Sequence, residues 1–314
     1  MTVRYRPADS LSSPRFTGPR TFMRLPYITD LDGVDIAVIG IPTDGAVSYR
    51  SGARFGPEAI RSASVLLRSY SRDLDVDVAE SLSIVDFGDA PTVPGYQEET
   101  LERVGRHISN VCRAGVTTLC LGGDHSMTLA ELRAAAGVHG PLGLIHLDAH
   151  ADVHDVYYGG IRYFHGTVFR RAVEEGLIEP ARTLQAGLRG TLHCREDRGA
   201  SRELGFEVLT WDELEHFGPE EFGARVRHRV GSGPTFLSFD IDFVDPAYAP
   251  GTGTPEVGGP SSKQALSLLG ALGGLKFVGF DLMEVSPPYD PGGVTSWLAA
   301  SLCHHMLCLR ALAP

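Results

Sequence analysis

Long apolar segments are absent from this sequence of 314 residues. No apolar run approaches the roughly 18 to 20 residues that a membrane-spanning helix needs. Residues 1–20 also lack the apolar core of a signal peptide. We therefore expect a cytoplasmic protein that has no membrane partner.

Cysteine is scarce, and its spacing indicates no site. The five cysteines are odd in number and form no CxxC pair, which disfavours both a disulfide framework and a structural zinc site. We expect them to be small buried hydrophobic residues. They are Cys112, Cys120, Cys194, Cys303 and Cys308.

Positive charge is in the minority, with 28 Lys and Arg against 39 Asp and Glu and a net charge of -11. A nucleic-acid partner would need a clustered basic face, so we expect none. Part of the acidity is available for metal ligands. Hydrophobic residues make up 43% of the chain and charged residues 21%, which predicts a folded protein with a large core.

Eight short apolar or β-branched runs alternate with longer helix-like stretches. Several runs are apolar at nearly every position, as in parallel strands buried on both faces and joined by crossover helices. The runs cover residues 34–41, 82–87, 117–121, 142–147, 183–186, 206–209, 235–241 and 276–282. The helices are expected at residues 57–69, 100–114, 126–136, 167–176 and 262–272. The pattern predicts an α/β fold, with one mostly parallel sheet that has helices on both faces.

Residues 1–30 are polar and contain proline, with one apolar patch at Phe22, Met23 and Leu25. We expect this segment to be an arm that packs on the body of a single domain spanning residues 1–314. The Pro/Gly-rich stretch at 245–260 follows a strand directly. We interpret it as a functional loop, because ligand sites in such sheets lie at strand carboxyl ends.

The sequence that follows the strand at 142–147 carries the strongest chemical signal. Side chains alternate in an extended segment, so Asp148, His150 and Asp152 point the same way. A hydrogen-bonded polar strand end is the alternative, but two carboxylates and an imidazole on one face repel or stay unsatisfied without a cation. His146 has the same parity but lies deeper, and we assign it to the core or to the surroundings of the ligands.

Two further strand ends add matching residues. Asp240 and Asp242 follow the run at 235–239, and His125 follows two glycines at the end of another strand. With these residues the set contains four Asp and two His, which is too many ligands for one metal. Hard oxygens mixed with imidazole favour manganese, and the absence of thiolate makes zinc a poorer candidate.

Two divalent ions can share a water molecule and lower its pKa, which predicts a hydrolase. Glu284 follows the last strand, where a carboxylate can receive a planar guanidinium through paired hydrogen bonds. His165 precedes a probable helix and can move protons between the site and solvent. On their own, Glu284 and His165 are also typical of helix caps. Asp124, Asp155 and Asp245 fit the pattern less well, and we expect them either to support the ligands from behind or to structure loops.

Five ordered segments together resemble the ureohydrolase family of arginases, agmatinases, guanidinobutyrases and proclavaminate amidinohydrolase. They lie at residues 122–126, 148–152, 165–167, 238–242 and 284–287. The resemblance implies a three-layer arginase fold, two Mn²⁺ ions per chain and a homo-oligomer, either a trimer or a hexamer. It implies hydrolysis of a guanidino group to urea and an amine.

The resemblance also implies a role for each residue. One ion would be held by His125, Asp148, Asp152 and Asp240, and the other by Asp148, His150, Asp240 and Asp242. Asp152 would hydrogen-bond the bridging hydroxide, Glu284 would bind the guanidinium, and His165 would relay protons.

The substrate tail is less defined. Arginases have an Asn two positions after the last Asp of the DxHxD motif, and this chain has His154, which disfavours free arginine. His154, Tyr158 and Arg162, together with Arg24 of the arm, are the expected tail contacts. They favour a guanidino acid such as 4-guanidinobutyrate or a proclavaminate-like compound. Agmatine is the alternative, since the loop tyrosines can hold an amine by cation–π contact.

Two other classes of protein stay open. A zinc deacetylase-like amidohydrolase on a similar fold would need one metal, whereas a guanidine-compound-binding subunit would need no catalysis. Counting bound metal per chain separates the first from a binuclear enzyme, and urea release separates the second.

Overall fold

The computed structural model describes residues 3–313, and its main feature is an eight-stranded parallel sheet. The strands are β1 (Ile36–Ile41), β4 (Ile84–Asp89), β5 (Thr117–Gly122), β6 (Leu142–Leu147), β7 (Ile178–Leu188), β8 (Glu207–Thr210), β9 (Thr235–Asp240) and β10 (Phe277–Met283). Their order is β4-β1-β5-β10-β9-β6-β7-β8. The predicted sheet is confirmed, and every pair in it is parallel.

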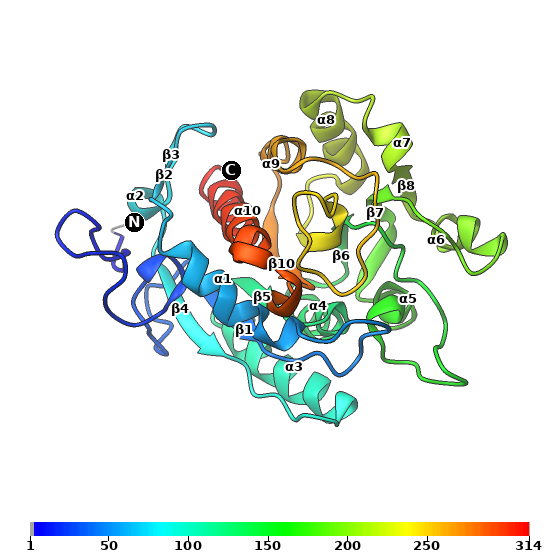
Figure 1. Ribbon diagram of the computed structural model, residues 1–314, viewed down its shortest axis with the longest axis horizontal. Helices are drawn as coiled ribbons and strands as arrows, with labels where there is room; N and C mark the ends of the chain where they lie inside the picture. Colours follow the sequence, from blue (N-terminus) through cyan, green and yellow to red (C-terminus); the bar gives the residue numbers. More distant parts are fainter. Residues whose placement is uncertain (1–2, 314) are drawn as a thin grey trace.

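Helices cover both faces of this sheet (Figure 1). One layer contains α1 (Gly56–Ser64), α8 (Pro219–Val230), α9 (Ser262–Gly270) and α10 (Val294–Ala311), and the other contains α3 (Gln97–Arg113), α4 (Thr128–His139) and α5 (Val168–Glu174). The short helices are α2 (Val78–Ser81), α6 (Ala200–Glu203) and α7 (Trp211–Leu214). The expected three-layer arrangement is therefore present.

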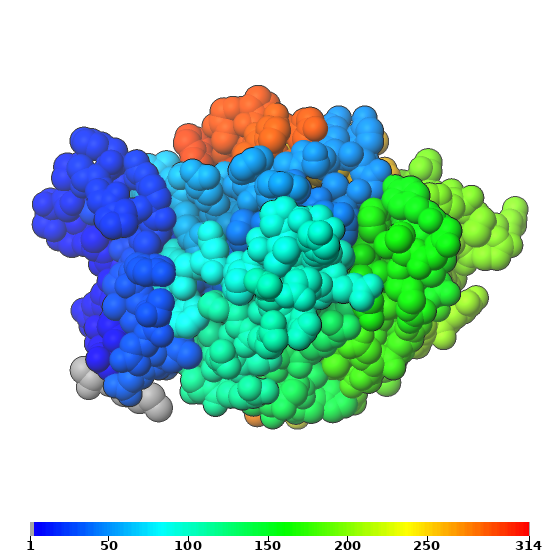
Figure 2. Space-filling model, turned by 90° about the horizontal axis from the view of Figure 1, so that it is seen from below, coloured from blue at the N-terminus to red at the C-terminus, as the bar shows by residue number. Residues whose placement is uncertain are grey.

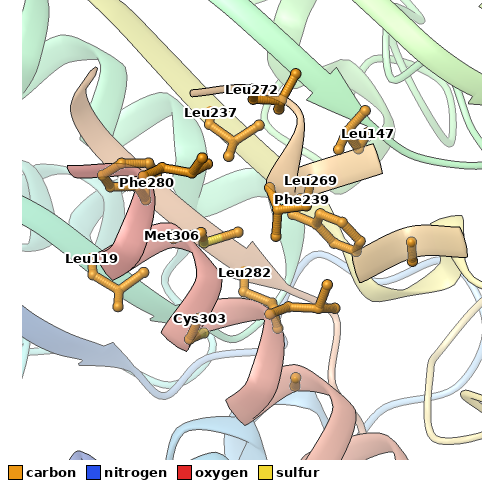
Figure 3. Close-up of a cluster of buried hydrophobic side chains, with 14 of the residues drawn as sticks. Leu119, Leu147, Leu237, Phe239, Leu269, Leu272, Phe280, Leu282, Cys303 and Met306 are labelled. Carbon is orange, nitrogen blue, oxygen red and sulfur yellow. The ribbon is translucent and has the colours of Figure 1, made fainter. Parts of the chain in front are cut away.

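Alternation along the strands divides the core into two clusters, one on each face. In β1, Ile36 and Val38 pack in the cluster under α1 and α10, while Ala37 and Ile39 pack in the cluster under α3 and α4. Residues that point to either face are mostly apolar, because both faces are covered. Figure 3 shows the first cluster, where side chains of β9 and β10 meet those of α9 and α10.

The N-terminal arm packs against the edge strand β4. The backbone N–H of Phe22 donates to Asp86 Oδ2 at 2.7 Å, and that of Met23 donates to Ser64 Oγ at 2.7 Å. Phe22, Met23 and Leu25 are buried. In Figure 2 the dark blue arm lies at the opposite end of the molecule from the green segment around residues 150–165.

Two sequence expectations need correction. The helix expected at 57–69 ends at Ser64, and a hairpin of β2 (Tyr70–Ser71) and β3 (Val76–Asp77) follows. Ser64 Oγ donates to the Arg61 carbonyl, which competes with helical hydrogen bonding at this end, and the same hydroxyl accepts the Met23 N–H of the arm. Cys194 is exposed rather than buried, since it lies in the loop after β7.

Candidate metal centre

The candidate residues follow four neighbouring strands in the middle of the sheet, β5, β10, β9 and β6. His125 follows β5, the 148–152 segment follows β6, Asp240 ends β9, and Glu284 follows β10. The carboxyl ends of parallel strands lie at one edge of the sheet. The strand order therefore brings together residues that are far apart in sequence.

Close packing, and not a left-handed turn, explains the two glycines before His125. A Cβ at Gly122 would overlap the Met283 side chain, and a Cβ at Gly123 would overlap the carbonyl oxygen of Thr43. Neither glycine has a positive φ. They allow the end of β5 to pack closely on β10 and on the end of β1, which brings His125 to the neighbouring carboxylates.

His125 is fully buried among three carboxylates. Its Nδ1 lies 3.0 Å from Asp240 Oδ2, 3.3 Å from Asp148 Oδ2 and 3.3 Å from Asp152 Oδ2. One ring nitrogen cannot donate a proton to three acceptors at once, whereas a cation among them can bind all four groups. We call these four residues the His125 half-site.

His150 faces a second group of carboxylates. Its Nδ1 lies 3.0 Å from Asp242 Oδ2 and 3.4 Å from Asp148 Oδ1. Asp148 thus directs Oδ2 to His125 and Oδ1 to His150, as a bridging carboxylate does. We call Asp148, His150 and Asp242 the His150 half-site.

The electrostatics indicate that the cluster requires positive charge. Burial, followed by repulsion from Asp148, raises the pKa of Asp152 to about 7. Burial and repulsion from Asp242 raise the pKa of Asp240 well above its ordinary value. In residues 3–313 no Lys or Arg lies within ion-pair distance of these carboxylates. Oxygen and imidazole donors without a counter-ion fit a hard or borderline divalent metal.

His146 lies close enough to be a ligand of the His125 half-site, but both of its ring nitrogens are engaged. Its Nε2 lies 2.7 Å from Asp148 Oδ2, and Gln185 Nε2 donates to its Nδ1 at 2.9 Å. Burial lowers the pKa of His146 to about 4, so the neutral ring donates to Asp148. This contact orients the Asp148 carboxylate. Gln185 was not identified from the sequence, where it is one polar residue within an apolar strand.

The other nitrogen of His125 leads to a second hydrogen-bonded chain. Nε2 lies 2.8 Å from Ser238 Oγ, which donates to Asp281 Oδ1 at 2.8 Å. Asp281 is fully buried and also accepts from Thr128 Oγ1 at 2.7 Å. The only signal for Asp281 in the sequence is a single acid inside the apolar run of β10.

Glu284 and His165 lie beside the His125 half-site. Glu284 has a positive φ of 65°, and its Oε1 accepts the backbone N–H of His125 at 2.9 Å. His165 Nδ1 lies 3.3 Å from the same oxygen, and Ser48 donates its backbone N–H to His165 Nε2 at 3.1 Å. Burial lowers the pKa of His165, but the Glu284 carboxylate outweighs it and the net shift is upward.

The expected contacts to the substrate tail separate into two groups. His154 is half-buried, and its ring lies edge-on to Tyr157 and to His193, with centroids 5.4 and 5.2 Å apart. Tyr158 is exposed and has a φ of 45°. Sequence reasoning missed His193, which lies in the loop after β7.

The two arginines are not brought to the cluster. Arg162 Nη2 donates to Glu174 Oε2 at 2.7 Å, on an exposed surface. Arg24 donates to the Ser13 carbonyl at 3.0 Å, within the N-terminal arm. The expectation that the arm lines the mouth of the site is thus wrong for this chain, because the arm packs at the far edge of the sheet.

Three acids that the sequence left outside the ligand set make local contacts. Asp124 accepts from the backbone of Ala46, and Asp245 accepts from the backbone of Gly258 and Gly259. Asp155 pairs with Arg171 at 2.7 Å. All three stabilise loops around the site.

Comparison with known proteins identifies the family. Residues 34–308 match the model of the arginase family. This chain belongs to the arginase family. The resemblance seen in the sequence is thereby confirmed, since the match covers every segment that carried it.

Several named relatives are similar over nearly the whole chain. A guanidinopropionase of Pseudomonas aeruginosa is 44% identical over 98% of this chain and 96% of its own length. Proclavaminate amidinohydrolase of Streptomyces clavuligerus is 46% identical over 97% of both chains. The solved structure of that Streptomyces enzyme has a TM-score of 0.91, with 45% identity, 95% of this chain and 99% of that chain covered.

Proposed function

We propose that this protein is a binuclear manganese amidinohydrolase, which cleaves the guanidino group of a small guanidino acid into urea and an amine. The observation that carries the proposal is the pair of half-sites sharing Asp148 at the carboxyl edge of an arginase-family sheet. One metal would explain one histidine with its carboxylates. Two histidines facing different oxygens of one carboxylate favour two metals over a mononuclear zinc site.

The proposed ligands divide between the two half-sites. His125, Asp148, Asp152 and Asp240 would hold one ion, and Asp148, His150, Asp240 and Asp242 the other. When bound, two such ions lower the pKa of a shared water molecule and supply the nucleophile. Asp152, whose Oδ2 lies 3.3 Å from His125 Nδ1, would accept a hydrogen bond from that nucleophile.

Glu284 is the proposed binding residue for the guanidinium. Its Oε1 is fixed by the His125 N–H, and Gly253, which has no side chain, lies next to Oε2. A carboxylate fixed at one oxygen can accept paired N–H groups from a planar cation. Glu284 is buried and has a positive φ, a backbone conformation that is unfavourable for glutamate and is typical of functional sites.

His165 is the proposed proton carrier. It lies between Glu284 and the partly exposed Ser48, whose hydroxyl is 2.8 Å from His165 Nε2. A proton can reach Nε2 from the surface through that hydroxyl, while the ring gives up the proton that Nδ1 carries on the Glu284 side. The substitution His165→Asn would keep a side chain of similar size and remove this path for protons.

The preference for a guanidino acid rests on relatives and on His154. Guanidinopropionase and guanidinobutyrase of Pseudomonas aeruginosa, each 44% identical, are named for guanidino acids. His154 and His193 offer N–H donors to a tail carboxylate, whereas Arg162 is engaged elsewhere. An agmatinase of Neisseria meningitidis at 43% identity keeps agmatine as the second candidate, with Tyr157 and Tyr158 as the groups that would hold its amine.

The test is urea release from Mn²⁺-loaded protein with 3-guanidinopropionate, 4-guanidinobutyrate, agmatine and arginine. We expect the highest kcat/KM for a guanidino acid, and a loss of about tenfold with that substrate in His154→Ala. A wild type that prefers agmatine by tenfold or more would contradict the substrate assignment. If no compound released urea, the proposed activity would be contradicted. The remaining candidate would then be a non-catalytic subunit that binds guanidine compounds.

Three remaining expectations belong to the same proposal. No helix among residues 3–313 is long and apolar enough to cross a membrane. We propose a cytoplasmic location, a single domain over residues 1–314, and assembly into a trimer or hexamer. Cell fractionation, limited proteolysis and light scattering with size exclusion test these in turn.

A further inference from the structure

The His150 half-site has a neighbour that none of the proposed roles includes. While Nδ1 of His150 faces Asp148 and Asp242, the opposite ring nitrogen, Nε2, lies 3.9 Å from Glu256 Oε1. Within residues 3–313, His150 is the only basic group within ion-pair distance of the Glu256 carboxylate. Glu256 lies in the loop at 245–260 that follows the turn bearing Asp242.

Two contacts fix Glu256 in this place. Arg189 Nη2 donates to the Glu256 carbonyl at 2.8 Å and to the Asp242 carbonyl at 2.7 Å, so one guanidinium joins the loop to the ligand turn. The carboxylate itself lies over Gly190, where an added Cβ would overlap it. Gly190 has a φ of 77°, which also favours glycine.

We propose that Glu256 is a positioning residue for His150. The Glu256 carboxylate would accept a hydrogen bond from the Nε2–H of His150. This hydrogen bond would hold the ring in the tautomer whose Nδ1 lone pair faces the metal. Metal-binding histidines usually donate their second N–H to such an acceptor, which fixes the ring orientation. A movement of about 1 Å brings the pair from 3.9 Å to ordinary hydrogen-bond distance.

This inference rests on the proposed binuclear metal function and adds a residue to it. The competing role for Glu256 is in substrate binding, because its side chain is partly exposed and an anionic group there could attract an amine tail. A positioning role acts on metal binding in the absence of substrate, whereas a role in tail binding acts on KM. The two are therefore separable.

The first measurement is the affinity of the purified full-length chain for Mn²⁺ alone, by equilibrium dialysis. In Glu256→Ala we expect one of the two ions to bind about 10- to 100-fold more weakly. Glu256→Gln should stay within about threefold of wild type, since its amide oxygen accepts the same proton. Glu221→Ala, which removes an exposed glutamate of α8, is the matched control and should have no effect.

Gly190→Ala provides an independent variant that displaces the carboxylate without removing it, and it should weaken the same ion. Kinetics complete the test. In Glu256→Ala the Mn²⁺ concentration for half-maximal urea release should rise by the same factor. The KM for 4-guanidinobutyrate at saturating Mn²⁺ should stay within about twofold of wild type.

Unchanged Mn²⁺ affinity in Glu256→Ala would overturn the inference, as would an equal loss in Glu256→Gln. A changed KM with unchanged metal affinity would assign Glu256 to the substrate tail instead. A wild-type chain that binds no Mn²⁺ and releases no urea would overturn the proposed function itself, which is a different result from any of these.

Discussion

The two histidines of the metal centre have different surroundings although both follow strands of one sheet. His125 is fully buried, faces three carboxylates, and is bonded on its other side to Ser238 and, through it, to Asp281. The His150 side chain is 33% exposed and faces two carboxylates. From this comparison we predict that an ion bound in the His125 half-site would be held more tightly and would exchange more slowly than one in the His150 half-site.

The largest expected effect comes from Asp240→Asn, which removes a charge from the His125 half-site and would impair both halves if Asp240 bridges them. Several kcal/mol of transition-state stabilisation correspond to on the order of 1,000-fold in rate. We expect that loss together with at least one ion, and a retained fold. Metal analysis and circular dichroism check this, and two bound ions with normal turnover would contradict it.

Asp281→Asn tests whether the chain behind His125 explains its tighter half-site. The substitution keeps the size of the side chain but weakens the acceptor for Ser238. We expect the more tightly bound Mn²⁺ to weaken by about 10- to 100-fold, while the other ion is little changed. Dialysis against graded Mn²⁺ gives both constants. Equal weakening of both ions would argue against separate support for the two halves.

The stability of the metal-free protein should fall as pH rises from 6.5 to 8.5. Asp152 has a pKa raised to about 7, and the pKa values of His125 and His150 are also raised because nearby carboxylates outweigh burial. Each group binds more protons folded than unfolded, so the stability it contributes is lost as pH rises through its folded pKa.

The pKa of His146 is lowered to about 4, so below pH 6.5 this residue makes the stability rise with pH. The predicted fall in stability is therefore measured from pH 6.5 upward. We expect Tm in chelator to fall by a few degrees across this range, on the order of 1 kcal/mol. Mn²⁺ should reverse the trend, because its ligands bind deprotonated. A Tm that rises with pH in chelator would contradict this account.

Substitution of Glu131 tests whether the buried carboxyl group near the His125 half-site lowers the stability of the fold. Neither of its oxygens has a hydrogen-bond partner within residues 3–313, and burial raises its pKa well above the ordinary value. Above the unfolded pKa, folding must take up a proton, so this cost grows with pH. Glu131→Met should raise the free energy of unfolding by about 1 to 3 kcal/mol at pH 8, and by less at pH 5. Denaturant titrations at the two pH values measure the difference.

The smallest effect is expected from Arg162→Ala. Its guanidinium pairs with Glu174 on an exposed surface, where ion pairs contribute little. We expect kcat/KM for guanidino acids to stay within about twofold of wild type, in contrast to His154→Ala. A loss of tenfold or more would show that Arg162 turns toward the substrate, as expected from the sequence for a contact to the substrate tail.

The residues proposed as metal ligands can be found in the sequence because their signal is local. In Asp148, His150 and Asp152 the period of two is visible in five residues, and burial of the preceding strand is visible in its composition. The tail residues were less predictable, since Arg162 and Arg24 are both cationic residues near motifs. Whether such a side chain faces a site depends on competing partners, here Glu174 and Ser13. No sequence pattern reveals those partners.

The sequence alone indicated the eight strands of the sheet, their mostly parallel pairing, and the acids and histidines at the strand ends. These follow from continuous apolar runs and from polar residues at the ends of those runs. Tertiary structure decided which strands are neighbours. It therefore also decided that His125 and Glu284, which are 159 residues apart in the sequence, share a hydrogen bond. It also decided that Ser238, Asp281 and Glu256 lie behind the two histidines. Strand order depends on how the helices pack on both faces, so contacts across it are set by the whole core and not by any local segment.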